Sequence, residues 1–304
     1  MDKLYYILIA VVILVVIVII IHYFLQNNNT IYHEYPITFQ KFDFDNYYLP
    51  KIIWMYWNDT NNIPICVKNI VKNNTSVLKE WKINFLTDAT LSQYIPDKDI
   101  PSFKKVKVIQ RSDWIRLYLL DTYGGCWLDA SVIINDEKAF YKLRDDSIKK
   151  QSLFTGFYFG KYVTNNKFCH IESSFIMAPK DSSVIKTWRK EFEKAISMGF
   201  HNYKKIVKKN KNLKLKNIYR WHRDVYLTIY ACFYNMSEYF DESIRDHFIL
   251  YDAGTTIFKL QEECKWNKEC LHKKLKSKEI KKNPYIKLIN GDRKGLTLDN
   301  YHLL

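Results

Sequence analysis

The sequence predicts an α/β protein in which a parallel sheet carries helices on its faces and one apolar helix precedes the globular part. Residues 51–86 alternate strand, helix and strand, the order in which parallel sheets with covering helices are built. Residues 102–134 add a long helix, a Gly-Gly turn and another apolar strand. Residues 4–25 contain no Asp, Glu, Lys or Arg, so this run stands apart in composition.

Residues 4–25 are interpreted as an uncleaved transmembrane anchor. A helix of about 20 apolar residues crosses a bilayer, and Ile7–Ile21 is wholly aliphatic. The alternative, a cleaved signal peptide, has an apolar core of about 7–15 residues and a small-residue cleavage site, whereas HYFLQNNNT follows here. Lys3 precedes the run and the next lysine is Lys41. The positive-inside rule then favours a single-pass type II protein with a cytosolic tail at residues 1–3 and a lumenal, ER- or Golgi-like body.

The rest of the chain divides by composition into a stem at residues 26–50, a globular domain at 51–260 and a basic C-terminal extension at 261–304. The formal net charge of +15 indicates attraction to an acidic partner. Lysines gather in Lys204–Lys216 and Lys265–Lys287. These stretches are interpreted as solvated helix surface or, alternatively, as contacts with anionic lipid headgroups or an acidic acceptor. No nucleic-acid-binding module accompanies them, so nucleic acid is not a predicted partner.

Apolar and aromatic runs mark the expected strands of the globular domain, and longer periodic stretches mark its helices. Strands are expected at Lys51–Trp57, Lys82–Leu86, Cys126–Ile134, Ser152–Gly160 and Ile171–Ala178. Helices are expected at Pro64–Trp81, Ser102–Tyr123, Asp181–Met198 and Asp224–Met236. Gly124 and Gly125 end the second of these helices, because glycine takes the left-handed conformation of a helix C-terminus at little cost.

The six cysteines include no C-x-x-C pair, so a structural zinc site is not predicted. Cys264 and Cys270 are close enough in sequence for a local disulfide. Free thiols in a reduced compartment are the alternative, and the sequence leaves both open.

Three charged side chains are candidates for chemistry. Asp113 and Arg116 lie three residues apart on a predicted helix, on the face that also carries Ile109 and Leu120. A charged pair on an apolar face is costly unless it has a function or forms an internal salt bridge. Asp129 follows the Gly-Gly turn and a short strand. A carboxylate at the end of a parallel strand lies where such sheets bind ligands, although an ordinary turn residue is the alternative.

Three strings follow one another in the globular domain. Residues 50–57 read PKIIWMYW, residues 81–88 read WKINFLTD and residues 112–131 read SDWIRLYLLDTYGGCWLDAS. In order and spacing they resemble glycosyltransferase family 32, the D-x-D sugar-binding type, whose block S-D-x-x-R…Y-G-G-x-[YW]-x-D-x-[DTS] matches the third string. The likeness is greatest to capsular polysaccharide synthesis proteins and to relatives of the Och1-type mannosyltransferases.

This resemblance implies a GT-A-type, Rossmann-like nucleotide-sugar-binding domain. It implies a UDP- or GDP-sugar donor, a glycan or glycoconjugate acceptor, Mn²⁺ or Mg²⁺ as cofactor, and retention of configuration at the anomeric carbon. Sugar transfer releases a nucleoside diphosphate, so negative charge builds on the leaving oxygen. A cation bound to the phosphates stabilises that charge.

The resemblance also assigns roles to single residues. Trp54, or its neighbour Trp57, is expected to stack on the nucleotide base. The remaining assignments are Asp88 near the base or ribose, Asp113 and Arg116 on the donor sugar and phosphate, Tyr123 and Gly125 beside the nucleotide, and Asp129 with Ser131 as metal ligands of the D-x-D motif.

One position departs from the family pattern. Ser131 occupies the third D-x-D position, and a hydroxyl is a weaker, uncharged metal ligand. Ser131 therefore supports an alternative function, a catalytically inactive relative that binds a glycan or a partner. A basic membrane-anchored nucleic-acid binder is a third possibility, supported only by net charge. His222 and Asp224 are further candidates for contacts with the acceptor or with a metal, and Asp252 is a weaker one.

Overall fold

The computed structural model describes residues 11–20, 37–103, 106–159, 170–209 and 225–298. The chain falls into two compact units, Met1–Ile37 and Thr38–Leu304. Of the predicted anchor, only residues 11–20 are described, and they are helical. Among the residues that the structure describes, none of the helices combines the length and the apolar character that a membrane span requires. The membrane anchor therefore stays a prediction.

The second unit is built on a six-stranded sheet with the strand order β2-β1-β3-β6-β5-β7. Its strands are β1 (Ile52–Tyr56), β2 (Lys82–Leu86), β3 (Gly125–Leu128), β5 (Phe154–Phe159), β6 (His170–Ala178) and β7 (Phe248–Asp252). β1 pairs in parallel with β2 and β3, and β5 pairs in parallel with β7. β6 is antiparallel to both of its neighbours. The predicted parallel sheet is thus a mixed sheet in which parallel pairs predominate.

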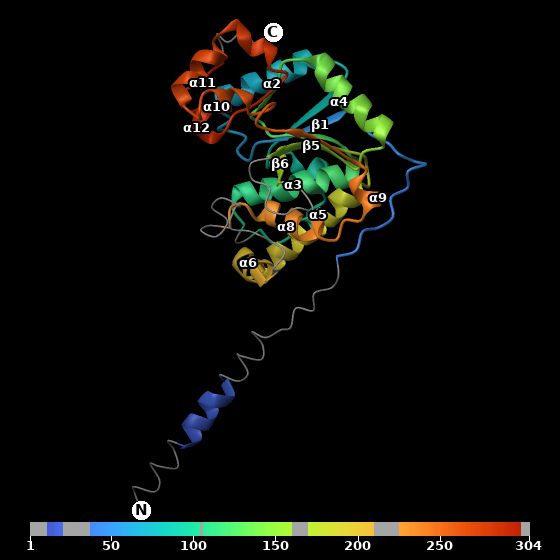
Figure 1. Cartoon of the computed structure of the whole chain (residues 1–304). Helices are drawn as coiled ribbons and strands as arrows, with labels where there is room; N and C mark the ends of the chain where they lie inside the picture. The colour runs from blue at the N-terminus through green and yellow to red at the C-terminus, as the bar shows by residue number, and fades with distance from the viewer. Residues whose placement is uncertain (1–10, 21–36, 104–105, 160–169, 210–224, 299–304) are drawn as a thin grey trace, which may run out of the picture. The chain divides into compact units, whose positions relative to one another are not determined.

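Helices cover both faces of this sheet (Figure 1). On one face lie α3 (Val108–Tyr123), α5 (Ser183–Met198), α6 (Phe200–Lys209), α8 (Thr228–Ser237) and α9 (Glu242–Arg245). On the other lie α2 (Ile65–Val77), α4 (Glu137–Lys150), α10 (Lys259–Glu263), α11 (Lys268–Leu275) and α12 (Asn290–Arg293). Side chains of β1 alternate between the two layers: Ile53 and Met55 join the apolar cluster with α2 and α4, while Trp54 points to the opposite layer beside the end of α3.

The segment predicted as one strand, Cys126–Ile134, forms two strands in different sheets. β3 ends at Leu128, and the backbone turns at once, with the Val132 amide donating to the Asp129 carbonyl at 2.9 Å. β4 (Val132–Ile134) then pairs antiparallel with β8 (Tyr285–Lys287). The turn Asp129–Ser131 between the two strands consequently lies beside the C-terminal part of the chain, which composition alone marks only as a basic extension.

Other helices and strands also differ from the predicted ones. The helix expected from residue 102 begins at Val108. The sequence patterns do not predict α4 and β7. α4 is rich in charged residues and buries only Phe140, Leu143 and Ser147, so its apolar pattern is weak. Its start is nevertheless defined by Asp136, whose side chain accepts a hydrogen bond from the amide of Ala139.

Cys264 and Cys270 form a disulfide that links the end of α10 to α11. Of the two alternatives that the sequence left open, the structure has the local bridge. Cys66, Cys126 and Cys232 are buried free thiols. None of the described cysteines belongs to a cluster of three or more His, Cys, Asp or Glu side chains that could hold a metal ion.

The Gly-Gly turn is required by close packing on both sides. Gly124 ends α3 with a φ of +68°, and its amide donates to Leu120 O at 3.0 Å. Gly125 has a φ of +98°, and a Cβ on it would lie 2.4 Å from the carbonyl oxygen of Ile52 in β1. Both positions therefore exclude a side chain, and the pairing of β1 with β3 depends on this.

Replacing Gly125 with alanine is expected to lower the free energy of unfolding by roughly 2 to 5 kcal/mol, through backbone strain and the clash with Ile52. Gly291→Ala is the matched control, because nothing lies within 4 Å of the added Cβ and its φ is ordinary. Thermal or urea denaturation of the full chain measures both variants. Equal stability of the two variants would contradict this explanation of the turn.

Candidate active site

A pocket of about 600 Å³ opens at the carboxyl ends of β1 and β3. Tyr56 and Trp57 line it from the end of β1, and the turn Asp129–Ser131 lines it from the end of β3. α3, β6, α8 and the segment from β8 to α12 supply the remaining walls. The carboxyl ends of parallel strands are where open α/β sheets bind ligands, so this pocket is the candidate active site.

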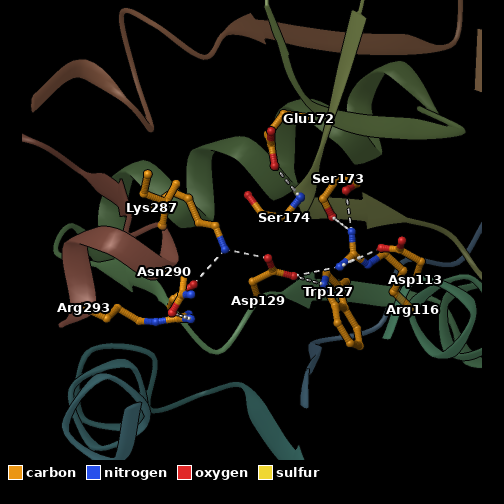
Figure 2. A network of polar contacts seen from close by, with 12 residues as sticks. Asp113, Arg116, Trp127, Asp129, Glu172, Ser173, Ser174, Lys287, Asn290 and Arg293 are labelled. Atoms are coloured by element: carbon orange, nitrogen blue, oxygen red, sulfur yellow. Dashed lines mark hydrogen bonds and ion pairs between the residues drawn. The ribbon is translucent and has the colours of Figure 1, made fainter. Parts of the chain in front are cut away.

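The carboxylate of Asp129 is the centre of the polar network in this pocket (Figure 2). Its Oδ1 accepts hydrogen bonds from Arg116 Nη2 at 3.0 Å and from Trp127 Nε1 at 2.9 Å. Its Oδ2 accepts one from Lys287 Nζ at 2.5 Å. The backbone is fixed as well, because the Asp129 amide donates to Ser174 O in β6 at 2.8 Å. The side chain of Asp129 is therefore held in one orientation by three donors.

The ionisation of Asp129 differs from that of its acidic neighbour. Burial alone raises the pKa of Asp129, but the positive charges of Lys287 and Arg116 outweigh it, and the pKa is lowered. Burial raises the pKa of Glu172, which Lys287 and a hydrogen bond from the Ser174 amide only partly offset. Asp129 is thus the anionic group to which the cations of the pocket bind.

Arg116 is buried and is held from several sides. Nη1 donates to the backbone oxygen of Ser173 at 2.9 Å and also to its hydroxyl. Nη2 lies 3.4 Å from Asp113 Oδ1, and the guanidinium stacks over the ring of Trp127, 5.1 Å from its centre. The sequence prediction that Asp113 and Arg116 share an inward face is confirmed in geometry: they form an ion pair, and Arg116 joins it to Asp129.

Lys287 is a central residue of the site that sequence reasoning missed. It belongs to β8, and its Nζ bonds both Asp129 Oδ2 at 2.5 Å and Ser131 Oγ at 2.7 Å. The side chain is only 11% exposed, although it lies in a stretch that the sequence marks as solvated surface or lipid contact. The local sequence Ile286-Lys287-Leu288 carries no signal of burial, because a lysine between two apolar residues is also the alternation of a strand whose polar side chains face solvent.

The residues predicted to bind a divalent metal do not fit one as they are arranged. Asp129 and Ser131 both already bond the same ammonium group. A second cation between them would meet the positive charge of Lys287 at short range. Within the described ranges, no group of three or more His, Cys, Asp or Glu side chains is placed to hold a metal ion. The dependence on Mn²⁺ or Mg²⁺ stays a prediction, which the arrangement around Lys287 does not favour.

Of the two tryptophans predicted to stack on a base, Trp57 lines the pocket and Trp54 does not. Trp54 is 1% exposed, packs on Tyr94 and Tyr123, and donates from Nε1 to Gly124 O at 2.9 Å. A base has no access to the ring of Trp54, so base stacking stays a prediction for Trp57 alone. Trp54 lies on the inner face of β1, where it supports the Gly-Gly turn.

The other residues predicted to contact the nucleotide are not among those that line the pocket. Asp88 accepts hydrogen bonds from Tyr56 Oη at 2.5 Å and from Arg111 Nη2 at 2.5 Å, and of these three only Tyr56 lines the pocket. Tyr123 Oη donates to the backbone oxygen of Tyr94 at 2.7 Å, and its ring packs on Trp54. Gly125 packs against β1. Asp88, Tyr123 and Gly125 are therefore not lining residues of this pocket, although the side chain of Asp88 is 44% exposed beside Tyr56, and their nucleotide contacts stay predictions.

The remaining candidates do not enlarge the site. His222 and Asp224 lie outside the described residues. Asp252 ends β7 and accepts a hydrogen bond from the Thr255 amide at 2.9 Å, and it is not among the residues that line the pocket. The pocket instead includes side chains that the sequence did not predict: Glu172, Ser173, Tyr226, Tyr230, Asn290 and Arg293.

The geometry places a pocket with paired charges at the ligand-binding edge of an α/β sheet, and comparison with known proteins identifies the family. Residues 22–277 match the family model described as capsular polysaccharide synthesis protein. Because this match spans most of the chain, the protein belongs to the capsular polysaccharide synthesis protein family.

One curated relative is the O-glycosyltransferase PaGT of Phomopsis amygdali, 24% identical over 153 residues, which are 45% of this chain and 34% of that protein. The chain therefore spans about a third of that relative's length. The match supports the prediction that the chain is a glycosyltransferase. The narrower resemblance to family 32 and to Och1-type enzymes stays a prediction.

Two solved structures are also similar. The first is described as a glycosyltransferase involved in the glycosylation of the major capsid of PBCV-1; it is 14% identical, with 80% of this chain and 96% of that chain covered and a TM-score of 0.38. The second is PaToxG Glycosyltransferase, 13% identical, with 66% and 83% covered and a TM-score of 0.34. TM-scores this low do not establish a common fold.

Asp113 gives a pH dependence that stability measurements can detect. Burial raises its pKa from 3.8 to about 7, although Arg116 opposes the shift. A raised pKa means that the folded state holds the proton more tightly, so this stabilisation is complete below pH about 4 and is lost as the pH rises through about 7. Between pH 5 and pH 8, the free energy of unfolding of the wild-type protein is expected to fall by roughly 2 kcal/mol more than that of Asp113→Asn.

Urea denaturation of the full chain at both pH values makes this comparison. Parallel stability curves for wild type and Asp113→Asn would show that Asp113 does not titrate in this range.

The two tryptophans are expected to respond differently to alanine substitution. Trp57→Ala should weaken binding of UDP or GDP by roughly 5- to 100-fold, the range for loss of one base–aromatic stack. Trp54→Ala should instead lower the free energy of unfolding by about 3 to 5 kcal/mol, because it leaves a cavity between β1 and α3. Calorimetry with the nucleotides and thermal denaturation separate the two effects. Undiminished nucleotide binding by Trp57→Ala would remove it from the site.

Proposed function

We propose that the protein is a glycosyltransferase that moves a sugar from a UDP- or GDP-sugar to a glycan or glycoconjugate acceptor. One observation carries the proposal: the pocket at the carboxyl ends of β1 and β3 combines the aromatic ring of Trp57 with the cations Lys287 and Arg293. A nucleotide-sugar presents a flat base and a diphosphate, which need these two kinds of partner. The family to which the chain belongs supports the same conclusion.

The chemistry follows from charge. When the sugar leaves, negative charge develops on the diphosphate oxygen, and positive groups fixed beforehand lower the barrier. Arg293 lies over the ring of Trp57, 5.4 Å from its centre, so a base-binding and a phosphate-binding group are adjacent. Tyr226 and Tyr230 line the pocket from the α8 side. That wall has hydroxyl and ring surfaces of the kind that bind sugars, and we assign it to the transferred sugar or the acceptor.

Finer properties come from the resemblance to family 32. The domain is assigned to the GT-A type, and the reaction is assigned to retention at the anomeric carbon. The strand order and the pocket at the ends of β1 and β3 support the first assignment. Asp129 is too firmly bound by cations to serve as a free nucleophile, and no protein nucleophile is assigned.

The protein is also proposed to be anchored in a membrane through residues 4–25, with its globular part in the lumen. The Cys264–Cys270 disulfide supports this placement, because such bridges persist in oxidising compartments.

A binding protein without catalytic activity is the second candidate function. Ser131 in place of an acidic residue favours it, since the predicted metal site then has only one carboxylate. This second candidate binds a glycan or a partner, and the two candidates differ in turnover.

The proposal is tested with the full chain in detergent and a panel of UDP- and GDP-sugars, each with Mn²⁺ and with EDTA. Release of nucleoside diphosphate is expected from at least one donor. Asp129→Asn should reduce it by about 100-fold or more, of the order seen when a preorganised charge is removed from an active site. Asp145→Asn, at an exposed position away from the pocket, should keep wild-type activity.

Thermal denaturation of both variants checks that they are folded. Binding of a nucleotide-sugar without turnover would support the inactive binding protein. Absence of any nucleotide-sugar binding by calorimetry, with and without metal, would overturn the proposed transferase.

A further inference from the structure

Resting on the proposed function, we propose that the ammonium group of Lys287 is the built-in cation that binds the donor diphosphate, in the position that a divalent metal was predicted to take. Lys287 would then act in transfer without a metal between Asp129 and Ser131. The inference rests on the position of Nζ, on how β8 delivers it and on the charges around it.

The position of Nζ is that of a cation held by the two predicted metal ligands. It lies 2.5 Å from Asp129 Oδ2 and 2.7 Å from Ser131 Oγ. Both residues face the pocket, as does Lys287 itself. Figure 2 shows the lysine side chain extending from its own segment toward the carboxylate of Asp129. An ammonium has three donors, so after these two bonds one donor is left for a ligand in the pocket.

The backbone brings Lys287 to this place in a defined register. β8 pairs with β4, with Val132 opposite Lys287. The amide of Leu288 donates to Ser131 O at 2.9 Å, so the strand after the lysine is bonded to the turn that carries the motif. The amide of Lys287 donates to Ile257 O at 2.9 Å on the other side. The backbone bonds of β8 therefore hold Lys287 in the site, although 158 residues separate it from Asp129.

The charges around Lys287 leave the pocket able to accept an anion. Asp129 carries one negative charge and is shared by two cations, Arg116 and Lys287. Arg293 adds a further positive charge to the lining of the same pocket. Glu172 and Asp113 are the acidic groups of the lining that oppose this balance, and burial raises the pKa of both, that of Asp113 to about 7. A diphosphate, rather than a further metal cation, is the ligand that this balance attracts.

The same arrangement gives a physical reason for Ser131. A hydroxyl accepts the hydrogen bond from Lys287 and adds no charge. An aspartate there would be a second anion beside the ammonium and would neutralise it, which would leave less positive charge for phosphate. The serine that departs from the D-x-D pattern thus suits a lysine partner.

In the transfer step, the bond between the anomeric carbon and the diphosphate oxygen breaks, and its electron pair stays on that oxygen. The acceptor hydroxyl oxygen forms the new bond to the anomeric carbon and loses its proton, which the released diphosphate or solvent takes up. Lys287 stabilises the charge on the departing diphosphate by a charge-assisted hydrogen bond. It exchanges no electrons, and no co-reactant is needed.

The test uses the full chain in detergent, with calorimetric binding of UDP, GDP and the corresponding nucleosides in EDTA, and donor turnover in EDTA and in Mn²⁺. Wild type is expected to bind a diphosphate and to release it from the donor in EDTA, with less than about a twofold gain from Mn²⁺. Lys287→Met should weaken diphosphate binding by roughly 10- to 100-fold, the range for a charge-assisted hydrogen bond, while nucleoside binding changes little.

Lys287→Arg should retain part of the affinity, because it keeps the charge. Lys149→Met is the matched control at an exposed position outside the pocket and should behave as wild type. If Lys287→Met does not fold, the EDTA measurements on wild type and on Lys287→Arg still show whether diphosphate binding and turnover need a metal.

Two results overturn the inference. If EDTA abolishes diphosphate binding and turnover by wild type and Mn²⁺ restores both, the proposed function stands and Lys287 is not the phosphate cation. If no donor or diphosphate binds with or without metal, the proposed function fails together with it.

Discussion

The carboxylate of Asp129, held between Arg116 and Lys287, is the interaction on which the rest of the site depends. Its two oxygens bind different cations, from α3 and from β8, which come from distant parts of the chain. A buried ion pair of this kind strongly destabilises a protein when one partner is removed, because a charge is then left without compensation. The network therefore fixes the position of three elements as well as the charge of the pocket.

The fold can be understood as the means of bringing these elements together. The two glycines allow α3 to end directly against β1, so that β3 begins at once and places Asp129 at the sheet edge. The chain then turns into β4, which provides an edge for β8. That pairing closes the apolar cluster around α2 and α4, and it also delivers Lys287. Stability and function are thus served by the same strand pair.

Much of this could be predicted from the sequence, for physical reasons. β1, β2 and β6 contain apolar runs, and Asp113 with Arg116 keeps the helical spacing that puts both on one face. Contacts between distant segments could not be predicted, because no local pattern encodes them. The split of 126–134 into two strands depends on β8, and the burial of Trp54 rather than Trp57 depends on how α3 meets β1. Lys287 lies in a lysine-rich stretch of the sequence, and only its burial in the folded protein distinguishes it from the other lysines.

The most direct measurement is an experimental structure of the full chain with UDP or GDP bound, crystallised in the presence of Mn²⁺. The account predicts the base on Trp57, the phosphate oxygens within hydrogen-bond distance of Lys287 Nζ and near Arg293, and Lys287 still bonded to Asp129. A Mn²⁺ ion between Asp129 and Ser131, with Lys287 turned away from both, would contradict it, as would a nucleotide bound outside this pocket.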